Sequence, residues 1–207
     1  MSILRQIFGP SKLKNEGWRQ FCDQFGGEFV PCGFLRGSEV QVRYKQWTIT
    51  LETFSESDGP ILTQMRTPFV NRRGFRFTIY RKTVFSDLGK KLGMQDIEIG
   101  EPEFDDAFII KGNDESKLRA LFGNPTIRQL IEQQPDVHLT VRDDEGWHGG
   151  PLPEGVHELC CRVPGEIDDV GWLVSYFDLL VEVLDYLHQT GSASGWPPRR
   201  QFPSSDH

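Results

Sequence analysis

The stretch VGWLVSYFDLLVEVLDYL, from Val170 to Leu187, decides the fold of this chain. Its apolar side chains recur at three- and four-residue intervals, which is the spacing of one face of an α-helix. They are Val170, Leu173, Val174, Phe177, Leu180, Val181, Leu184 and Leu187, and Asp178, Glu182 and Asp185 form an acidic stripe opposite them. The pattern predicts a long amphipathic helix that covers a core and ends near Gly191.

Two segments before this helix predict a pair of antiparallel strands. Apolar residues alternate with polar ones in both: Val137, Leu139 and Val141 in the first, and Leu159, Cys161 and Val163 in the second. If residue 138 lies opposite residue 162, all six apolar side chains share one face of the sheet. Cys160 and Cys161 then point to opposite faces, and His138 points to the polar face.

The first half of the chain predicts further strands. The apolar alternation of residues 40–44 and that of residues 47–51 have opposite parity, which indicates a tight turn or a bulge near Lys45-Gln46. Farther along, Ile61 to Phe69 and Phe75 to Tyr80 flank the sequence Asn71-Arg-Arg-Gly74. Because glycine suits a turn that needs positive φ, these two segments predict a β-hairpin.

Four shorter helices complete the prediction. The first spans Lys14 to Phe25 and is followed by Gly26-Gly27, and the second spans Phe85 to Leu92. A third begins with Asn113 or Asp114 as its N-cap, and Asn124-Pro125 provides the cap and first turn of a fourth.

These elements predict an α+β fold: a mostly antiparallel sheet with helices packed on one face and a long C-terminal helix. We expect residues 1–191 to form a single α+β domain, with two lobes, 14–92 and 93–191, as the alternative. Residues 192–207 are rich in Pro and Ser and predict a flexible tail. Trp196 begins a Trp-Pro-Pro-Arg-Arg sequence in this tail that could instead be a docking peptide.

An acidic segment, DIEIGEPEFDDAFIIKG from Asp96 to Gly112, precedes the third helix. It resembles a family of bacterial proteins of unknown function with the signature D-I-E-x-G, F-D-x-x-F-x-I-K-G followed by a short helix. The resemblance implies a folded, soluble bacterial protein and assigns no activity.

The carboxylates of this segment have two interpretations. Asp96, Glu98, Glu101, Glu103, Asp105 and Asp106 could supply oxygen ligands to a hard cation, although their spacing differs from that of an EF-hand calcium loop. Alternatively, Asp96 and Glu98 lie on the solvated face of a strand while Ile97 and Ile99 point inward. We favour the second interpretation and predict no metal and no cofactor.

A basic block precedes the acidic segment. Between Arg66 and Lys91 the chain has eight Lys and Arg residues and one acidic residue, Asp87. The simplest interpretation is mutual compensation of the two segments within the fold. The alternative is a surface for a polyanion, with Arg72, Arg73 and Arg76 as its candidate residues. The formal net charge of -7 argues against nucleic acid binding.

Motifs for catalysis are missing from the sequence, so we predict no catalytic residues. The cysteines lack metal-ligand spacing and predict reduced thiols. Trp147 and His148 lie in a Gly-rich stretch and could line a pocket, but we expect a turn with an exposed imidazole. Both are surface candidates, as is Trp196.

Composition leads to a prediction of function. No segment has the apolar length of a membrane span, and the first ten residues indicate a docked helical turn rather than a membrane anchor, so we expect a cytoplasmic protein.

The leading hypothesis is a non-catalytic module that binds a protein partner, with its oligomeric state open. The alternative is a small-molecule pocket protein or enzyme with a cavity between the sheet and the final helix, for which the 15 Phe residues would provide the lining.

Overall fold

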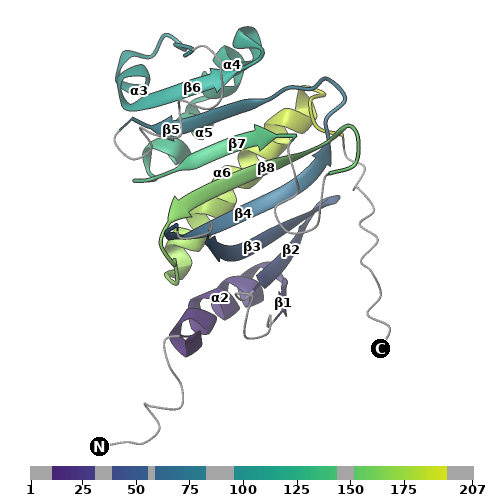
Figure 1. Ribbon diagram of the computed structural model, residues 1–207, viewed down its shortest axis with the longest axis vertical. Helices are drawn as coiled ribbons and strands as arrows, with labels where there is room; N and C mark the ends of the chain where they lie inside the picture. Colours follow the sequence, from purple (N-terminus) through teal and green to yellow (C-terminus); the bar gives the residue numbers. More distant parts are fainter. Residues whose placement is uncertain (1–10, 31–38, 56–58, 83–95, 144–151, 195–207) are drawn as a thin grey trace, which may run out of the picture.

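Alternating apolar and polar residues build one large sheet in the computed structural model, which describes residues 11–30, 39–55, 59–82, 96–143 and 152–194 (Figure 1). The strands are β1 (Glu28–Val30), β2 (Glu39–Tyr44), β3 (Trp47–Ser55), β4 (Ile61–Val70), β5 (Phe77–Arg81), β6 (Phe108–Gly112), β7 (His138–Arg142) and β8 (Val156–Pro164). The helices are α2 (Ser11–Phe25), α3 (Pro102–Ala107), α4 (Glu115–Phe122), α5 (Pro125–Glu132) and α6 (Val170–Gln189).

The eight strands pair antiparallel in the order β1-β2-β3-β4-β8-β7-β5-β6. Strands from residues 14–92 and from residues 93–191 therefore share one sheet. The helices pack against one face of it, and α6 crosses behind β4 and β8 in Figure 1. The predicted α+β class, antiparallel sheet and long C-terminal helix are confirmed.

The predicted register of the strand pair before α6 is also confirmed. His138 lies opposite Arg162, and Leu139 lies opposite Cys161. All six apolar side chains of this pair belong to the hydrophobic core. The parity change near residue 45 is a tight turn, because Tyr44 pairs with Trp47 and Lys45 has a φ of 53°.

The hairpin predicted for residues 61–80 is wrong, because β8 and β7 lie between β4 and β5. Asn71 explains the difference. Its side chain accepts from the backbone N–H of Phe75 and donates to the carbonyl of Phe75, while its own N–H donates to Gly155. The turn therefore ties the end of β4 to the start of β8, and β5 continues to the far side of the sheet.

Helix α6 begins at its N-cap Asp169, whose side chain accepts a hydrogen bond from the N–H of Trp172, and Gly191 follows its end with a φ of 71°. Its buried face is wider than the predicted stripe, because Tyr176, Leu179 and Val183 are buried as well. The reason is that α6 contacts the sheet and also α2 and α5. Among the described residues, no helix is long and apolar enough to cross a membrane.

Most of the shorter helices follow their predicted signals. Helix α2 runs to Phe25 and is followed by Gly26 with a φ of 62°. Asp114 caps α4, and Asn124 caps α5 with Pro125 in its first turn. Helix α3 was not predicted, because Glu-Pro-Glu-Phe-Asp-Asp has no apolar periodicity. The helix predicted for residues 85–92 lies outside the described residues.

The acidic segment has the predicted facing. Asp96 and Glu98 are exposed, whereas Ile97 and Ile99 pack against the core. Asp96 forms an isolated β-bridge with Lys111, and the N–H of Ile97 donates to the carbonyl of Ile110. The segment therefore covers the outer edge of β6.

Candidate functional site

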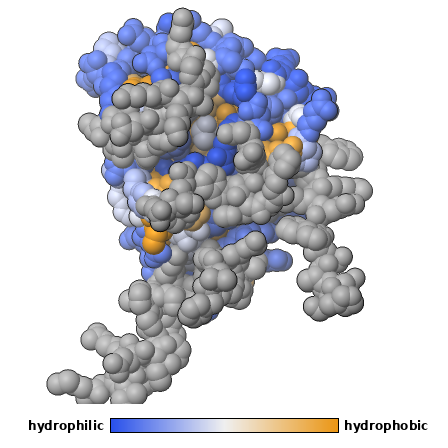
Figure 2. All heavy atoms as spheres, viewed as in Figure 1, coloured by the Kyte–Doolittle hydropathy of each residue, from blue (hydrophilic) through white to orange (hydrophobic). Residues whose placement is uncertain are grey.

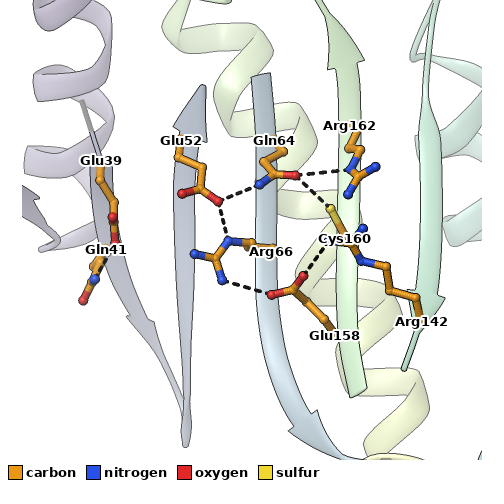
Figure 3. A network of polar contacts seen from close by, with 9 residues as sticks. All are labelled: Glu39, Gln41, Glu52, Gln64, Arg66, Arg142, Glu158, Cys160 and Arg162. Carbon is orange, nitrogen blue, oxygen red and sulfur yellow. Dashed lines mark hydrogen bonds and ion pairs between the residues drawn. The ribbon is translucent and has the colours of Figure 1, made fainter. Parts of the chain in front are cut away.

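Charged and polar side chains gather on the sheet face opposite α6, in the centre of the sheet (Figure 3). We call this group the polar network; it consists of Glu52 on β3, Gln64 and Arg66 on β4, Arg142 on β7, and Glu158, Cys160 and Arg162 on β8. Strand alternation places these side chains here because their neighbours Met65, Leu159 and Cys161 point into the hydrophobic core. On the same side of the molecule, the visible described surface is mostly hydrophilic, with small separate hydrophobic areas (Figure 2).

The centre of the polar network is a buried ion cluster. The Arg66 guanidinium pairs through Nε with Glu52 and through Nη1 with Oε1 of Glu158, at 3.0 Å. Arg142 Nη2 contacts the other oxygen of Glu158, also at 3.0 Å. Burial disfavours the charge on Arg66, but Glu52 and Glu158 outweigh this effect and raise the pKa of Arg66 above its ordinary value.

Gln64 connects the cluster to a third arginine. Its amide Nε2 donates to Glu52 Oε1 at 2.6 Å, and its carbonyl Oε1 accepts from Arg162 Nε at 3.2 Å. The Cys160 Sγ lies 3.5 Å from the same carbonyl oxygen. The surrounding charges thereby fix the orientation of a completely buried amide.

The two adjacent cysteines point to opposite faces, as predicted. Cys160 belongs to the polar network and Cys161 to the hydrophobic core. Burial raises the pKa of both thiols. Because the thiolate is the nucleophile, this environment makes both cysteines poor nucleophiles at neutral pH.

His138 lies beside the polar network on β7. Its Nε2 is 2.8 Å from the hydroxyl of Thr78. Burial, followed by the charges of Arg162 and Arg142, lowers the pKa of His138 to about 3. The imidazole is therefore neutral at physiological pH and is poorly matched to proton transfer there.

The members of the polar network bind one another. Its carboxylates accept hydrogen bonds from its arginines, and the Gln64 amide connects Glu52 with Arg162. Sequence reasoning placed Arg66 in a surface-like basic block and did not single out Glu52 or Glu158. These partners are 14 and 92 residues from Arg66 in the sequence, so only the strand order brings them together.

The predicted surface candidates are separated by the structure. Arg72 and Arg73 are exposed in the turn after β4, whereas Arg76 pairs with Asp143 at 2.5 Å. Arg66 and Arg76 therefore use carboxylates outside the acidic segment, which differs from the predicted mutual compensation of the two segments. Trp147, His148 and Trp196 lie outside the described residues.

The carboxylates of the acidic segment are used locally. Asp105 accepts hydrogen bonds from the backbone N–H groups of Ile99, Gly100 and Glu101, at 2.9 to 3.1 Å. Glu101 also pairs with Arg128 at 3.0 Å. Within the part of the chain that the structure describes, no three His, Cys, Asp or Glu side chains form a group that could hold a metal ion.

A second surface, on the outer side of α6, contains an exposed tryptophan that sequence reasoning missed. Trp172 is 41% exposed and stacks on Tyr176 with a ring-centroid distance of 6.3 Å. Asp178 is exposed farther along the helix, and Glu182 is partly exposed. The available signal was the position of Trp172, which falls beside the predicted apolar stripe rather than within it.

The interface between α6 and the sheet is filled by side chains. Leu173, Leu180 and Leu184 are completely buried and belong to one continuous hydrophobic cluster with residues from the central strands. On the α2 side, Phe177 contacts Phe21 and Phe25, with ring centroids 5.6 and 4.4 Å apart. The aromatic residues around α6 thus pack against one another.

Comparison with known proteins identifies no relative. No protein-family model matches the chain, and no curated protein or solved structure matches it significantly. The resemblance of the Asp96–Gly112 signature to a bacterial family remains a prediction.

Proposed function

We propose that this protein is a non-catalytic module that binds a protein partner through the outer side of α6. The observation that carries the proposal is the exposure of Trp172. Tryptophan is enriched among the residues that contribute most to protein–protein binding, because it buries a large, rigid apolar surface at little cost in side-chain entropy. Nearly all other large apolar side chains among the described residues are less exposed.

The local structure supports this role because it holds the indole in place. The Trp172 backbone N–H donates to the N-cap carboxylate of Asp169 at 3.0 Å, and the Trp172 ring stacks on the buried Tyr176. An anchor that is already ordered loses less entropy on binding than a mobile one. The alternative of a pocket between the sheet and α6 has less support, since side chains fill that interface.

Affinity purification from the organism that carries the gene tests the proposal. The bait is the full chain, compared with Trp172→Ala and with Ile61→Ala as the matched control, because Ile61, at 45%, is the other exposed large apolar residue in the part of the chain that the structure describes. We expect a protein that wild type and Ile61→Ala retain and Trp172→Ala loses, and that binds directly when purified. Recovery of the same proteins by all three baits would contradict the proposal.

A further inference from the structure

We propose that the surface around Trp172 binds a basic segment of a partner protein, with an Arg or Lys side chain over the exposed indole. This inference rests on the proposed function and names the chemical class of the partner. It combines the exposed ring with the charge of the helix that carries it.

The charge of this region is one-sided. From Val163 to Thr190 the sequence contains no Lys or Arg. The same residues include six carboxylates: Glu166, Asp168, Asp169, Asp178, Glu182 and Asp185. Lys45 reaches Asp185 from the turn between β2 and β3, at 2.7 Å, but Asp185 is near the other end of the helix from Trp172. Helix α6 and the segment that leads into it therefore carry an excess of negative charge, which favours a cationic partner.

Trp172 adds chemical selectivity to this attraction. A cation over the face of an indole is attracted by the ring quadrupole, and this cation–π attraction is stronger for tryptophan than for tyrosine or phenylalanine. Asp169 accepts from the backbone N–H of Trp172, so a carboxylate lies at the end of the helix that carries the ring. An arginine or lysine over the ring would therefore also be attracted by this carboxylate.

The positions along the helix also define what the partner must supply. Asp178 and Glu182 follow Trp172 by 6 and 10 residues, which at a rise of about 1.5 Å per residue places them roughly 9 and 15 Å farther along the axis. These carboxylates are spread along α6, so they suit several cationic side chains better than one ion.

A random 12-residue peptide library, displayed on phage and selected on the full chain, tests the inference without knowledge of the natural partner. The most enriched peptide is then synthesised with a fluorescein label, and its Kd is measured by fluorescence anisotropy at several salt concentrations. We expect the selected peptides to be enriched in Arg and Lys. We expect binding to weaken on the order of tenfold in Trp172→Ala and to weaken as salt increases.

The charge requirement is tested with two double variants that remove the same net charge. Asp178→Asn/Glu182→Gln removes carboxylates from α6, and Glu98→Gln/Glu103→Gln removes two exposed carboxylates from the acidic segment. Only the α6 variant should weaken peptide binding and reduce its salt dependence. Thermal melting of each variant confirms that it is folded.

Two results would overturn the inference: selected peptides with no excess of Arg and Lys, or equal binding to the two double variants. A natural partner that depends on Trp172 but docks through an apolar segment would leave the proposed function intact and contradict only the inference. An affinity purification that recovers no partner dependent on Trp172 would instead contradict the proposed function.

Discussion

Arg66 on β4 and Glu158 on β8 form an ion pair inside the sheet, with Nη1 3.0 Å from Oε1 and side-chain exposures of 4% and 0%. Each lies on the face opposite α6, where the partners Glu52 and Arg142 complete the cluster. A buried charge without its counterion is far less stable than a buried pair. We therefore expect the polar network to disfavour other pairings of β3, β4, β7 and β8.

Arg66→Ala should lower the free energy of unfolding by about 3–5 kcal/mol, because it leaves Glu52 and Glu158 buried without their shared cation. Arg76→Ala is the matched control. The pair of Arg76 with Asp143 is 44% and 47% exposed, so its loss should cost at most about 1 kcal/mol. Urea denaturation measures both values. Equal losses of unfolding free energy would show that the buried ion pairs of Arg66 stabilise the fold no more than the exposed pair of Arg76.

His138 gives the fold a defined pH dependence. The folded-state pKa is lowered to about 3, whereas imidazole in the unfolded chain titrates near 6.5. Below pH 6.5 the unfolded chain binds a proton that the folded chain excludes, so stability present above pH 6.5 is lost as the pH falls toward 3. Between pH 7.5 and 5, wild type should lose up to about 2 kcal/mol more than His138→Gln. Identical pH profiles of urea denaturation for the two proteins would contradict this assignment.

Gly17 allows α2 to pack against the segment that leads into α6. A Cβ at this position would lie 1.7 Å from the carbonyl oxygen of Asp168, and the neighbouring Trp18 donates through Nε1 to Ile167 at 2.8 Å. Gly17→Ala should therefore displace α2 and lower the free energy of unfolding by about 1–3 kcal/mol.

Gly171→Ala is the control for Gly17→Ala. A Cβ at Gly171 would approach a single atom, the Asp169 Oδ1, at 3.1 Å. Alanine also has the higher helix propensity, so this variant should remain within about 1 kcal/mol of wild type. A larger loss for Gly171→Ala than for Gly17→Ala, measured by chemical denaturation, would rule out the packing explanation.

Asp105 should stabilise the acidic segment, because its carboxylate accepts hydrogen bonds from three backbone N–H groups. Asp105→Ala is expected to lower the free energy of unfolding by about 1–3 kcal/mol, since it leaves these donors without their acceptor. Glu103→Gln, at an exposed position of the same helix, should have little effect. Differential scanning calorimetry compares the two, and a larger effect of Glu103→Gln would give the segment a different role.

Sequence patterns predicted what depends on neighbours along the chain. Alternation gave the pairing of His138 with Arg162, and helical periodicity gave α6, because burial on one face leaves a direct pattern in the residues. The same alternation could not show that β8, rather than β5, pairs with β4, because strands with similar patterns are interchangeable until their long-range partners are known. For the same reason Arg66 could not be matched with Glu158.

Trp172 was missed for a related reason. Tryptophan is usually largely buried, and the 41% exposure of Trp172 depends on how other elements pack against α6, which no local pattern contains. The acidic stripe of α6 was visible in the sequence, but its combination with an exposed ring required the fold.

Site-specific photo-crosslinking tests the central claim most directly. A photoreactive amino acid is placed at Gly171, the exposed position next to Trp172, and at Glu98, an exposed position of the acidic segment, as the control. Irradiation in the native host should give a discrete adduct with another protein from position 171, absent from position 98 and lost when Trp172→Ala is added. The absence of an adduct specific to position 171, or an adduct unaffected by Trp172→Ala, would contradict binding of a partner through the outer side of α6.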